Sequence, residues 1–287
     1  MALRRLDWPV AGRRKQRGSL LFVNGRGDFI EKYLETYAHF RTQGWGVTSF
    51  DWRGQGRSRG RGEEKVRAGF DIYVDDLTAL IEDWAAASPG PHVVLGHSMG
   101  GHLLLRAVID RKPPLDAIIL TAPMLEVNSK PIPIRIAPDI ADTMYWLGLG
   151  NVPMWKTPPA MLVPGGRRNR NLTASRERYE DELHWWGLEP EFNTGPPSFG
   201  WMRAAFRSRT ATFTAEKLGR VTLPILIIGA ERDRLVSADA IREAAALLPN
   251  AELEMMPDAA HEILRDCDAV RDRALARIDA FLAGVKI

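Results

Sequence analysis

A serine between small residues forms the most specific chemical motif of the sequence. Gly96-His97-Ser98-Met99-Gly100 directly follows the apolar run Val93-Val94-Leu95 and begins a segment with helical periodicity. A serine on such a sharp strand-to-helix turn has a strained backbone, and its hydroxyl stands exposed at the positive end of the helix. The pattern therefore predicts that Ser98 is a nucleophile. The alternative is a glycine-rich turn in which the serine only caps the helix.

A serine nucleophile needs a base, because the neutral hydroxyl reacts slowly and must lose its proton. The sequence contains six histidines, and His261 differs from the others in its position. It follows Asp258-Ala259-Ala260 in the loop after a late predicted strand, where a side chain can reach the carboxyl edge of a sheet. We expect His261 to be the base, and the alternative is a structural histidine of the loop.

An acid must orient the base, and it should lie on the loop after the preceding predicted strand. That loop offers two carboxylates, Glu231 and Asp233. We favour Asp233 because Leu235-Val236 follows it and can anchor the loop, while Glu231 is the reserve. Asp258 and Glu262 neighbour the base too closely in sequence to orient its ring, so we expect both to face solvent.

Acyl transfer at a serine creates an oxyanion, which requires two preorganised hydrogen-bond donors. We expect the backbone N–H of Met99, directly after the nucleophile, to be one donor. The turn Asn24-Gly25-Arg26-Gly27 follows the first strong predicted strand and should supply the other donor, through the N–H of Arg26. The alternative for this segment is a plain β-turn without a chemical role.

Strand and helix patterns alternate on both sides of these motifs. Short apolar runs predict buried parallel strands, and apolar residues at helical spacing predict the helices between them. The alternation implies parallel pairing with right-handed crossovers, so the predicted fold class is α/β. The predicted strands cover residues 20–23, 46–50, 93–95, 117–120, 224–229 and 251–256, and the predicted helices cover residues 29–40, 71–87, 98–110, 238–248 and 268–282.

A long segment interrupts this alternation between residues 122 and 215. It holds eleven prolines and five of the nine tryptophans, shows no clean strand, and has its best helical patterns at residues 139–147 and 173–186. Loops beyond ~12–15 residues are usually functional or disordered, and this segment is too apolar for disorder. We predict a single core of residues 1–121 and 216–287, into which residues 122–215 are inserted as a cap.

The overall composition excludes several classes of protein. With 45% hydrophobic and 26% charged residues, the chain is neither disordered nor fibrous. Its apolar runs are far shorter than the ~20 residues of a membrane-spanning helix, and the N-terminus lacks the apolar region of a signal peptide. The single cysteine, Cys267, excludes an intrachain disulfide and a zinc site built on several thiolates. We therefore expect a reducing, cytoplasmic compartment and neither a metal nor a cofactor.

The charge of the chain is only weakly informative, since 39 Lys and Arg stand against 36 Asp and Glu. Guanidinium groups can bind phosphate, but a net charge of +3 favours solvated surface arginines over a nucleic-acid partner. Basic clusters occur at Arg13-Arg14-Lys15, between Arg53 and Arg67, and at Arg167, Arg168 and Arg170.

Together the motifs resemble those of the α/β-hydrolase superfamily, and most closely the serine hydrolases of the monoacylglycerol lipase and lysophospholipase L2 group. The resemblance covers nearly the whole chain except the insertion. It implies a mostly parallel sheet with helices on both faces and a helical cap, and it makes Asp51 to Ser58 a structural turn beside the site. It rests on Asn24 to Gly27, Asp51 to Ser58, Gly96 to Gly101, Asp233 to Val236 and Ala260 to Glu262.

Two features depart from the family pattern. Asn24 stands where the family usually has a histidine before the glycine, but this residue shapes the oxyanion turn and does not react, so activity should survive. Only Leu3 to Val10 precedes the apolar run that begins at Leu20, so we expect the family's first antiparallel strand to be missing.

The resemblance implies a serine hydrolase that cleaves carboxylic esters through an acyl-enzyme, such as a lysophospholipase or a monoacylglycerol lipase. The alternatives are a short-chain carboxylesterase, an acyltransferase or a carbon–carbon hydrolase that uses the same triad. Epoxide and haloalkane chemistry would need an aspartate where Ser98 stands. A non-catalytic binding protein on this scaffold would usually have lost a triad residue, and none is missing here.

The implied partner is a small-molecule ester, in particular an acyl lipid. Arg167, Arg168 or Arg170 would then meet a phosphate on the leaving group. Peripheral membrane contact is compatible with such a substrate, although no amphipathic basic helix indicates it. No pattern indicates an oligomeric state. Apolar side chains of the insertion either line an acyl pocket or only pack the cap onto the core. They are Trp146, Trp155, Trp185, Trp186 and Trp201, with Met144, Met154, Met161, Met202, Phe192, Phe199 and Phe206.

Overall fold

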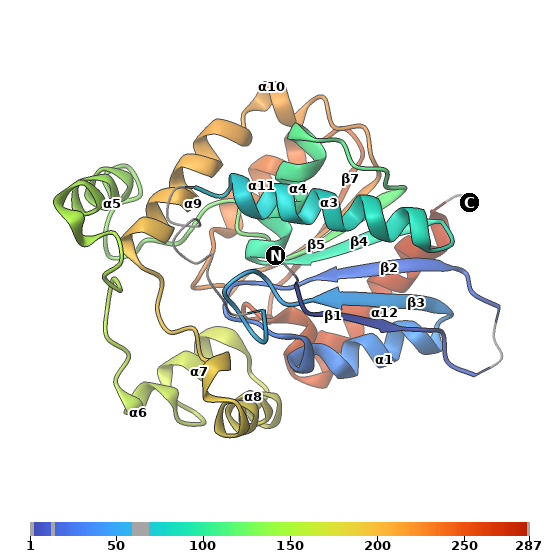
Figure 1. Ribbon diagram of the computed structural model, residues 1–287, viewed down its shortest axis with the longest axis horizontal. Helices are drawn as coiled ribbons and strands as arrows, with labels where there is room; N and C mark the ends of the chain where they lie inside the picture. Colours follow the sequence, from blue (N-terminus) through green and yellow to red (C-terminus); the bar gives the residue numbers. More distant parts are fainter. Residues whose placement is uncertain (1–2, 13–14, 59–68, 286–287) are drawn as a thin grey trace.

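The core of the molecule is one sheet, seen in a computed structural model that describes residues 3–12, 15–58 and 69–285 (Figure 1). Within these residues seven strands pair in the order β1-β3-β2-β4-β5-β6-β7. They are β1 (Arg5–Trp8), β2 (Gly18–Val23), β3 (Trp45–Phe50), β4 (His92–His97), β5 (Ala117–Thr121), β6 (Ile225–Ala230) and β7 (Ala251–Met256). The six predicted strands are confirmed, with ends that shift by one or two residues.

The expectation that the first antiparallel strand is missing is wrong. β1 pairs antiparallel with β3, from Arg5 opposite Phe50 to Trp8 opposite Val47, while all other strand pairs are parallel. The sequence pattern conceals this strand because it is short and lies at the edge of the sheet. Its side chains are alternately exposed and half-buried, so it lacks the continuous apolar run of the central strands.

Helices cover both faces of the sheet and bury its two sides separately. The helices of the core are α1 (Leu34–Thr42), α3 (Asp71–Ala87), α4 (Met99–Asp110), α11 (Ala238–Leu247) and α12 (Asp268–Gly284). α1 and α12 cover the face of Leu20 and Phe22, and the other three cover the face of Leu21 and Val23 (Figure 1). Because parallel strands end at the same edge, the loops after β4, β6 and β7 meet there.

The insertion consists of helices joined by irregular segments. These are α5 (Ala137–Met144) with a π-helical turn at Tyr145–Leu149, α6 (Pro159–Leu162), α7 (Arg167–Leu172), α8 (Arg176–Leu188), a 3₁₀ turn at Pro190–Phe192, α9 (Phe199–Thr212) and α10 (Ala215–Leu218). α5 and α8 correspond to the two predicted helices. The sequence does not reveal α9, because buried Arg203 and Ser208 interrupt the apolar face formed by Met202 and Phe206.

Large apolar side chains are exposed mainly on the insertion. Ten of the twelve in the described part of the chain belong to it, and eight of these lie between residues 134 and 155, which we call the apolar arm. Trp146 is 74% and Leu147 is 68% exposed, on or beside α5 at one end of the molecule (Figure 1). Of the helices described, none is both long and apolar enough to cross a membrane.

Candidate active site

Ser98 lies at the turn between β4 and α4 in a backbone conformation that few residues adopt. Its φ is 52° and its ψ is −117°. The N–H of Ser98 donates to the carbonyl of Thr121 (3.0 Å), and its carbonyl accepts from the N–H of Met124 (3.0 Å). A Cβ at Gly96 would lie 2.8 Å from the Cα of Gly101, so glycine is required where strand and helix approach. The predicted strained turn is confirmed.

The structure brings Ser98, His261 and Asp233 together in one chain of hydrogen bonds. Nε2 of His261 lies 2.9 Å from Oγ of Ser98, and Nδ1 lies 2.6 Å from Oδ2 of Asp233. The other carboxylate oxygen of Asp233 accepts the N–H groups of Leu235 (2.8 Å) and Val236 (3.0 Å). The side chains of His261 and Asp233 are 4% and 0% exposed, so the protein rather than water orients the imidazole. The arrangement can move a proton from the hydroxyl to the ring.

The pKa values of two histidines at this site, His261 and His97, are shifted in opposite directions. Burial alone would lower the pKa of His261, but the carboxylate of Asp233, with smaller contributions from Glu262 and Asp28, raises it above its ordinary value. Burial lowers the pKa of His97 to about 4, and His261, whose ring centre lies 5.0 Å away, adds to that effect. His97 therefore stays neutral beside a histidine that accepts protons readily.

The other acidic residues near the base do not contact its ring. Glu231, the reserve acid, forms an ion pair with Arg242. Asp258 is exposed as expected and pairs with Arg232. The expectation that Glu262 faces solvent is wrong, since its side chain is only 4% exposed. It is buried because a cation, described below, lies against it.

The turn after β2 is fixed on both sides of Arg26. The N–H of Gly25 donates to Asp28 (2.9 Å), and the N–H of Gly27 donates to the side chain of Gln55. Asn24 is buried and donates to the carbonyl of Phe50 (2.9 Å), which explains how a residue other than histidine can shape this turn.

Both predicted oxyanion donors, the backbone N–H groups of Arg26 and Met99, lack an acceptor among the described residues. The turn Asp51 to Ser58 supports this region as a structural element, because Gln55 belongs to it and Asp51 accepts the N–H of Ile30 (2.9 Å).

A buried group of charges, the Lys32 cluster, connects the site to the insertion. The Nζ atom of Lys32 donates to Asp28 (2.7 Å), to Glu182 of α8 (3.1 Å) and to Glu262 (2.6 Å). Each of these side chains is at most 5% exposed. Asp28 holds the oxyanion turn through Gly25, and Glu262 follows His261, so one ammonium group joins three segments.

Two arginines complete the Lys32 cluster. Arg168 of α7 donates to both carboxylate oxygens of Glu182 (2.7 and 2.9 Å), and Arg265 donates to Glu262 (3.3 Å). Burial would raise the pKa of Glu182, but Lys32 and Arg168 hold it well below its usual range. Arg168 is therefore engaged within the protein, contrary to the expectation that it meets a phosphate.

Sequence reasoning missed the Lys32 cluster. Lys32 and Asp28 stand four residues apart, a spacing that permits an ion pair on one helical turn, and this was the available local signal. Glu182 lies 150 positions from Lys32 and Glu262 lies 230 positions from it, so no local pattern connects them.

The insertion packs directly on the turn after β2. The guanidinium of Arg26 lies 5.3 Å from the ring centre of Trp201 and donates to the carbonyl of Gly195 (2.9 Å). Phe192 stacks on Phe29, with ring centres 4.4 Å apart. These contacts place the insertion over the same edge of the sheet as Ser98.

Several apolar side chains of the insertion are used for packing or are exposed. Met202 and Phe206 belong to a small buried cluster between α5 and α9, and Phe192 is buried against the core. Trp146 and Trp155 are 74% and 52% exposed. For these five residues the structure favours packing or surface exposure over the lining of an acyl pocket.

A cavity of about 630 Å³ lies beside the loops that carry Asp233 and His261. We call it the arginine pocket, because the charged residues that line it are Arg167, Arg170, Arg176, Arg232, Arg234 and Asp258. Arg13, Arg14 and most of the basic segment up to Arg67 lie outside the described residues.

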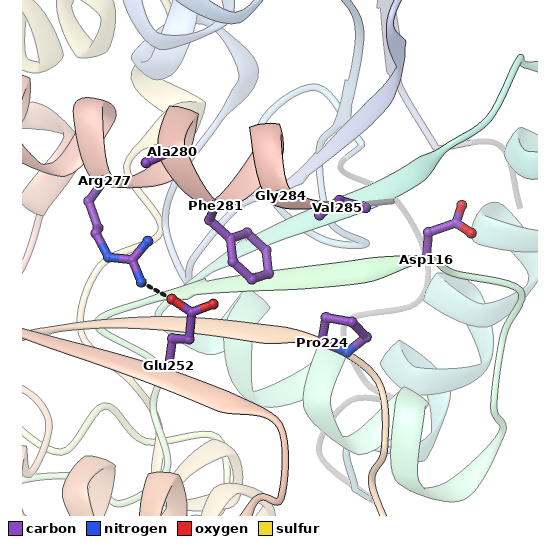
Figure 2. Close-up of a pocket in the computed structure, with 8 residues that line it drawn as sticks. All are labelled: Asp116, Pro224, Glu252, Arg277, Ala280, Phe281, Gly284 and Val285. Atoms are coloured by element: carbon purple, nitrogen blue, oxygen red, sulfur yellow. Dashed lines mark hydrogen bonds and ion pairs between the residues drawn. The ribbon is translucent and has the colours of Figure 1, made fainter. Parts of the chain in front are cut away.

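A second cavity, of about 430 Å³, lies at the opposite edge of the sheet (Figure 2). Asp116 and Pro224, which precede β5 and β6, line it. Figure 2 shows the ring of Phe281 between Pro224 and the ion pair of Arg277 with Glu252. Because Ser98 follows the carboxyl end of β4, this cavity is not part of the candidate site.

The chain is similar to known hydrolases over nearly its whole length. A family model described as serine aminopeptidase, S33, matches residues 14–268. Lysophospholipase L2 of Escherichia coli is 30% identical over 281 residues, which cover 90% of this chain and 78% of that protein. Monoglyceride lipase of Rattus norvegicus is 24% identical over 282 residues, which cover 96% and 85%.

The fold is shared with a solved lipase structure. The monoacylglycerol lipase of Paleococcus ferrophilus matches with a TM-score of 0.74 over 99% of each chain, at 18% sequence identity. At this identity the likeness shows the fold alone, which is that of the α/β hydrolases. The resemblance and the fold class predicted from the sequence are confirmed.

Proposed function

Because this chain belongs to the α/β-hydrolase family described as serine aminopeptidase, S33, and to its lysophospholipase and monoglyceride lipase group, we propose that Ser98 is the nucleophile of an acyl-enzyme mechanism. The observation that carries the proposal is the unbroken chain of hydrogen bonds from Ser98 through His261 to Asp233. Neutral His261 accepts the hydroxyl proton as Oγ attacks the carbonyl carbon, and Asp233 stabilises the imidazolium that forms.

The remaining steps follow from the same geometry. The tetrahedral intermediate carries its negative charge within reach of the N–H groups of Arg26 and Met99, which are each worth ~10²–10³ in rate. His261 then gives its proton to the leaving alcohol as the carbon–oxygen bond breaks, and an acyl-Ser98 remains. Water then attacks this acyl group while His261 takes one of its protons. The bond between the acyl carbon and Oγ of Ser98 breaks, His261 gives that proton to Oγ, and the carboxylic acid leaves.

The preferred substrate of this mechanism is a carboxylic ester of an acyl lipid. The relatives described above are named as a lysophospholipase and a monoglyceride lipase, names that designate hydrolases of lipid esters. The apolar arm supports contact with a lipid surface, since eight exposed large apolar side chains are concentrated in this one segment. The arginines beside His261 disfavour a substrate with a cationic amino terminus, as an aminopeptidase would need.

We assign residues 122–215 the role of a cap over the nucleophile. Contacts of Trp201 and Phe192 with the turn after β2 support this role, because access to Ser98 then depends on the insertion. A short-chain carboxylesterase, an acyltransferase and a carbon–carbon hydrolase would share the triad and differ in what the cap admits.

A fluorophosphonate probe tests the nucleophile directly. The native protein should be labelled, and Ser98→Ala should abolish labelling and reduce kcat/KM for acyl esters by at least ~10³-fold, because no other group forms the acyl-enzyme. Ser129→Ala, which removes a hydroxyl of the insertion, is the matched control and should retain both. Labelling that persists in Ser98→Ala would overturn the proposal.

Substrate profiling tests the lipid assignment separately. Hydrolysis of monoacylglycerols, lysophospholipids and p-nitrophenyl esters should increase with acyl length, because each buried CH₂ contributes ~0.8 kcal/mol. A strict preference for acetate would contradict an acyl lipid substrate while leaving the role of Ser98 intact.

A further inference from the structure

The insertion has two parts, and α7 with α8 forms the part that contacts the loop of the base. These two helices lie together, well apart from α5 and the apolar arm (Figure 1). The N–H of Glu262 donates to the carbonyl of Leu172 in α7 (2.7 Å), and the amide nitrogen of His261 lies 3.5 Å from the carbonyl oxygen of Asn171. The last turn of α7 is therefore bound to the backbone that carries the base.

α8 contributes one buried carboxylate, Glu182, to the Lys32 cluster. Its two oxygens accept from Arg168 (2.7 and 2.9 Å), and one of them also accepts from Nζ of Lys32 (3.1 Å). The side chains of Lys32 and Glu182 are 2% and 1% exposed, so solvent does not screen this contact. An ammonium group has three protons, and Lys32 directs them at three carboxylates. Loss of Glu182 would therefore let the ammonium group shift toward Asp28 and Glu262.

Asp28 transmits the position of this ammonium group to the oxyanion turn. One of its carboxylate oxygens accepts from Lys32 (2.7 Å), and the other accepts the N–H of Gly25 (2.9 Å). Gly25 lies tightly against the nucleophile, because a Cβ added there would be 3.2 Å from the Cβ of Ser98. Arg26, whose N–H is a predicted oxyanion donor, comes next in the chain. A shift of Asp28 would therefore move this donor relative to Ser98.

Stabilisation of an oxyanion depends steeply on the position of its donors. Donors must lie about 2.7–3.1 Å from the oxyanion, and a misplacement of roughly 1 Å caused by a distant substitution can cost about 10²-fold in rate. The hydrogen bonds that join Ser98, His261 and Asp233 do not include Lys32. A shift of the oxyanion turn would therefore weaken oxyanion stabilisation more than proton transfer.

We propose that Glu182 of the insertion is a positioning residue for the oxyanion donor at Arg26. It acts through Lys32 and Asp28. The inference rests on the proposed function, since an oxyanion forms only if Ser98 attacks a carbonyl group. It gives α7 and α8 a second role beside that of a cap, because these helices then support the groups that stabilise the transition state.

Glu182→Gln tests the proposal because it removes a charge with little change of shape. Arg168 donates to both oxygens of Glu182, whereas a glutamine offers a single acceptor oxygen. The paired contact is then lost, and the contact with Lys32 weakens. Glu180→Gln is the matched control, since Glu180 is an exposed carboxylate of the same helix. Glu182→Asp keeps the charge on a shorter side chain and is the conservative variant.

Two esters that differ in one atom report on the oxyanion donors. They are p-nitrophenyl butyrate and the thionoester in which sulfur replaces its carbonyl oxygen. Sulfur is a weak acceptor, so the donors stabilise the thiono transition state less. In Glu182→Gln we expect kcat/KM to fall by roughly tenfold for the oxygen ester and by less than about threefold for the thionoester. Each rate is referred to the concentration of protein that a fluorophosphonate probe labels, so that unfolded molecules are not counted.

The expected pattern is a selective loss with the oxygen ester in Glu182→Gln, a loss of roughly threefold in Glu182→Asp and no loss in Glu180→Gln. Equal losses with both esters would show a general structural role and overturn the proposal, and so would unchanged rates. Equal increases of KM for both esters would restrict Glu182 to the cap and overturn it as well. If Glu182→Gln does not fold, the same comparison of esters in Glu182→Asp decides.

These outcomes are distinct from failure of the proposed function. If the fluorophosphonate probe does not label native protein, or labels Ser98→Ala equally, Ser98 is not the nucleophile, whatever the Glu182 variants do. If Ser98 is labelled but lipid esters are not hydrolysed, the lipid assignment fails. p-Nitrophenyl butyrate and its thionoester then still test the role of Glu182.

Discussion

Two groups of cations lie next to each other where the insertion meets the core, and their surroundings differ sharply. In the Lys32 cluster every cation contacts a carboxylate, and the three carboxylates are buried. In the arginine pocket, Arg167 and Arg234 are exposed and form no ion pair among the described residues. The same short helix contributes to both, since α7 places Arg168 in the cluster and Arg167 at the pocket.

The difference shows how cationic side chains can either hold the structure together or remain available at the surface, depending on whether carboxylates pair with them. Removing charges from water is costly, so buried cations persist only where carboxylates compensate them. The Lys32 cluster is compensated and joins the oxyanion turn, the loop of the base and the insertion, which makes it a positioning element. In the arginine pocket, Arg167 and Arg234 are not compensated by a carboxylate among the described residues, and their charges remain exposed.

Removal of Lys32, the central cation of the Lys32 cluster, should cause the largest change in the free energy of unfolding. Lys32→Met keeps the approximate length of the side chain but leaves Asp28, Glu182 and Glu262 without their shared donor. We expect the free energy of unfolding to fall by ~3–5 kcal/mol, because one partner of a buried ion pair is lost. Urea denaturation measures this change. Arg234→Met is the matched variant in the arginine pocket and should lose far less.

Equal losses of the free energy of unfolding in Lys32→Met and Arg234→Met would contradict this difference, since both groups would then be equally structural. Enzymatic activity provides a second test. Where folded Lys32→Met protein can be isolated, its kcat should fall, because Asp28 no longer holds the N–H of Gly25 in place.

As the pH falls, the Lys32 cluster should lose its stabilising effect before the arginine pocket is affected. The pKa values of Asp28 and Glu182 are lowered in the folded protein, despite burial, by Lys32. Their stabilising effect is complete above the unfolded pKa, about 4.5 for glutamate, and is lost as the pH falls toward the lower folded value.

Glu182→Gln should therefore flatten the decline of the free energy of unfolding between pH 5 and pH 3, by about 1.4 kcal/mol for each unit of pKa shift removed. Glu180→Gln, on the exposed side of the same helix, should leave the slope unchanged. Parallel slopes in native protein and Glu182→Gln would show that Glu182 contributes nothing through its charge.

The smallest change in the free energy of unfolding is expected for substitutions in the arginine pocket. Arg167→Ala and Arg234→Ala remove exposed charges without an ion pair, so the free energy of unfolding should change by no more than ~0.5 kcal/mol. At low salt it should rise slightly, because repulsion between guanidinium groups is relieved. Thermal unfolding at two salt concentrations checks this. A loss above 2 kcal/mol in either variant would mean that the pocket is structural.

Much of the fold and of the candidate site can be predicted from the chain. The central strands are buried on both faces and therefore appear as unbroken apolar runs, while β1, at the edge, escapes notice. α9 is missed because Arg203 is buried within it. The three residues of the hydrogen-bond chain, in contrast, each follow a strand that the sequence indicates.

By itself the sequence determined that Ser98 stands on a strained turn, because glycines that permit such a turn, Gly96 and Gly100, stand two residues before and after it. It also determined that His261 and Asp233 follow neighbouring strands, since strand patterns are local. Only the tertiary structure decided that Glu262 is buried against Lys32, which lies 230 positions away. It likewise decided which arginines are compensated, because the pairing of charges depends on distances that sequence separation does not encode.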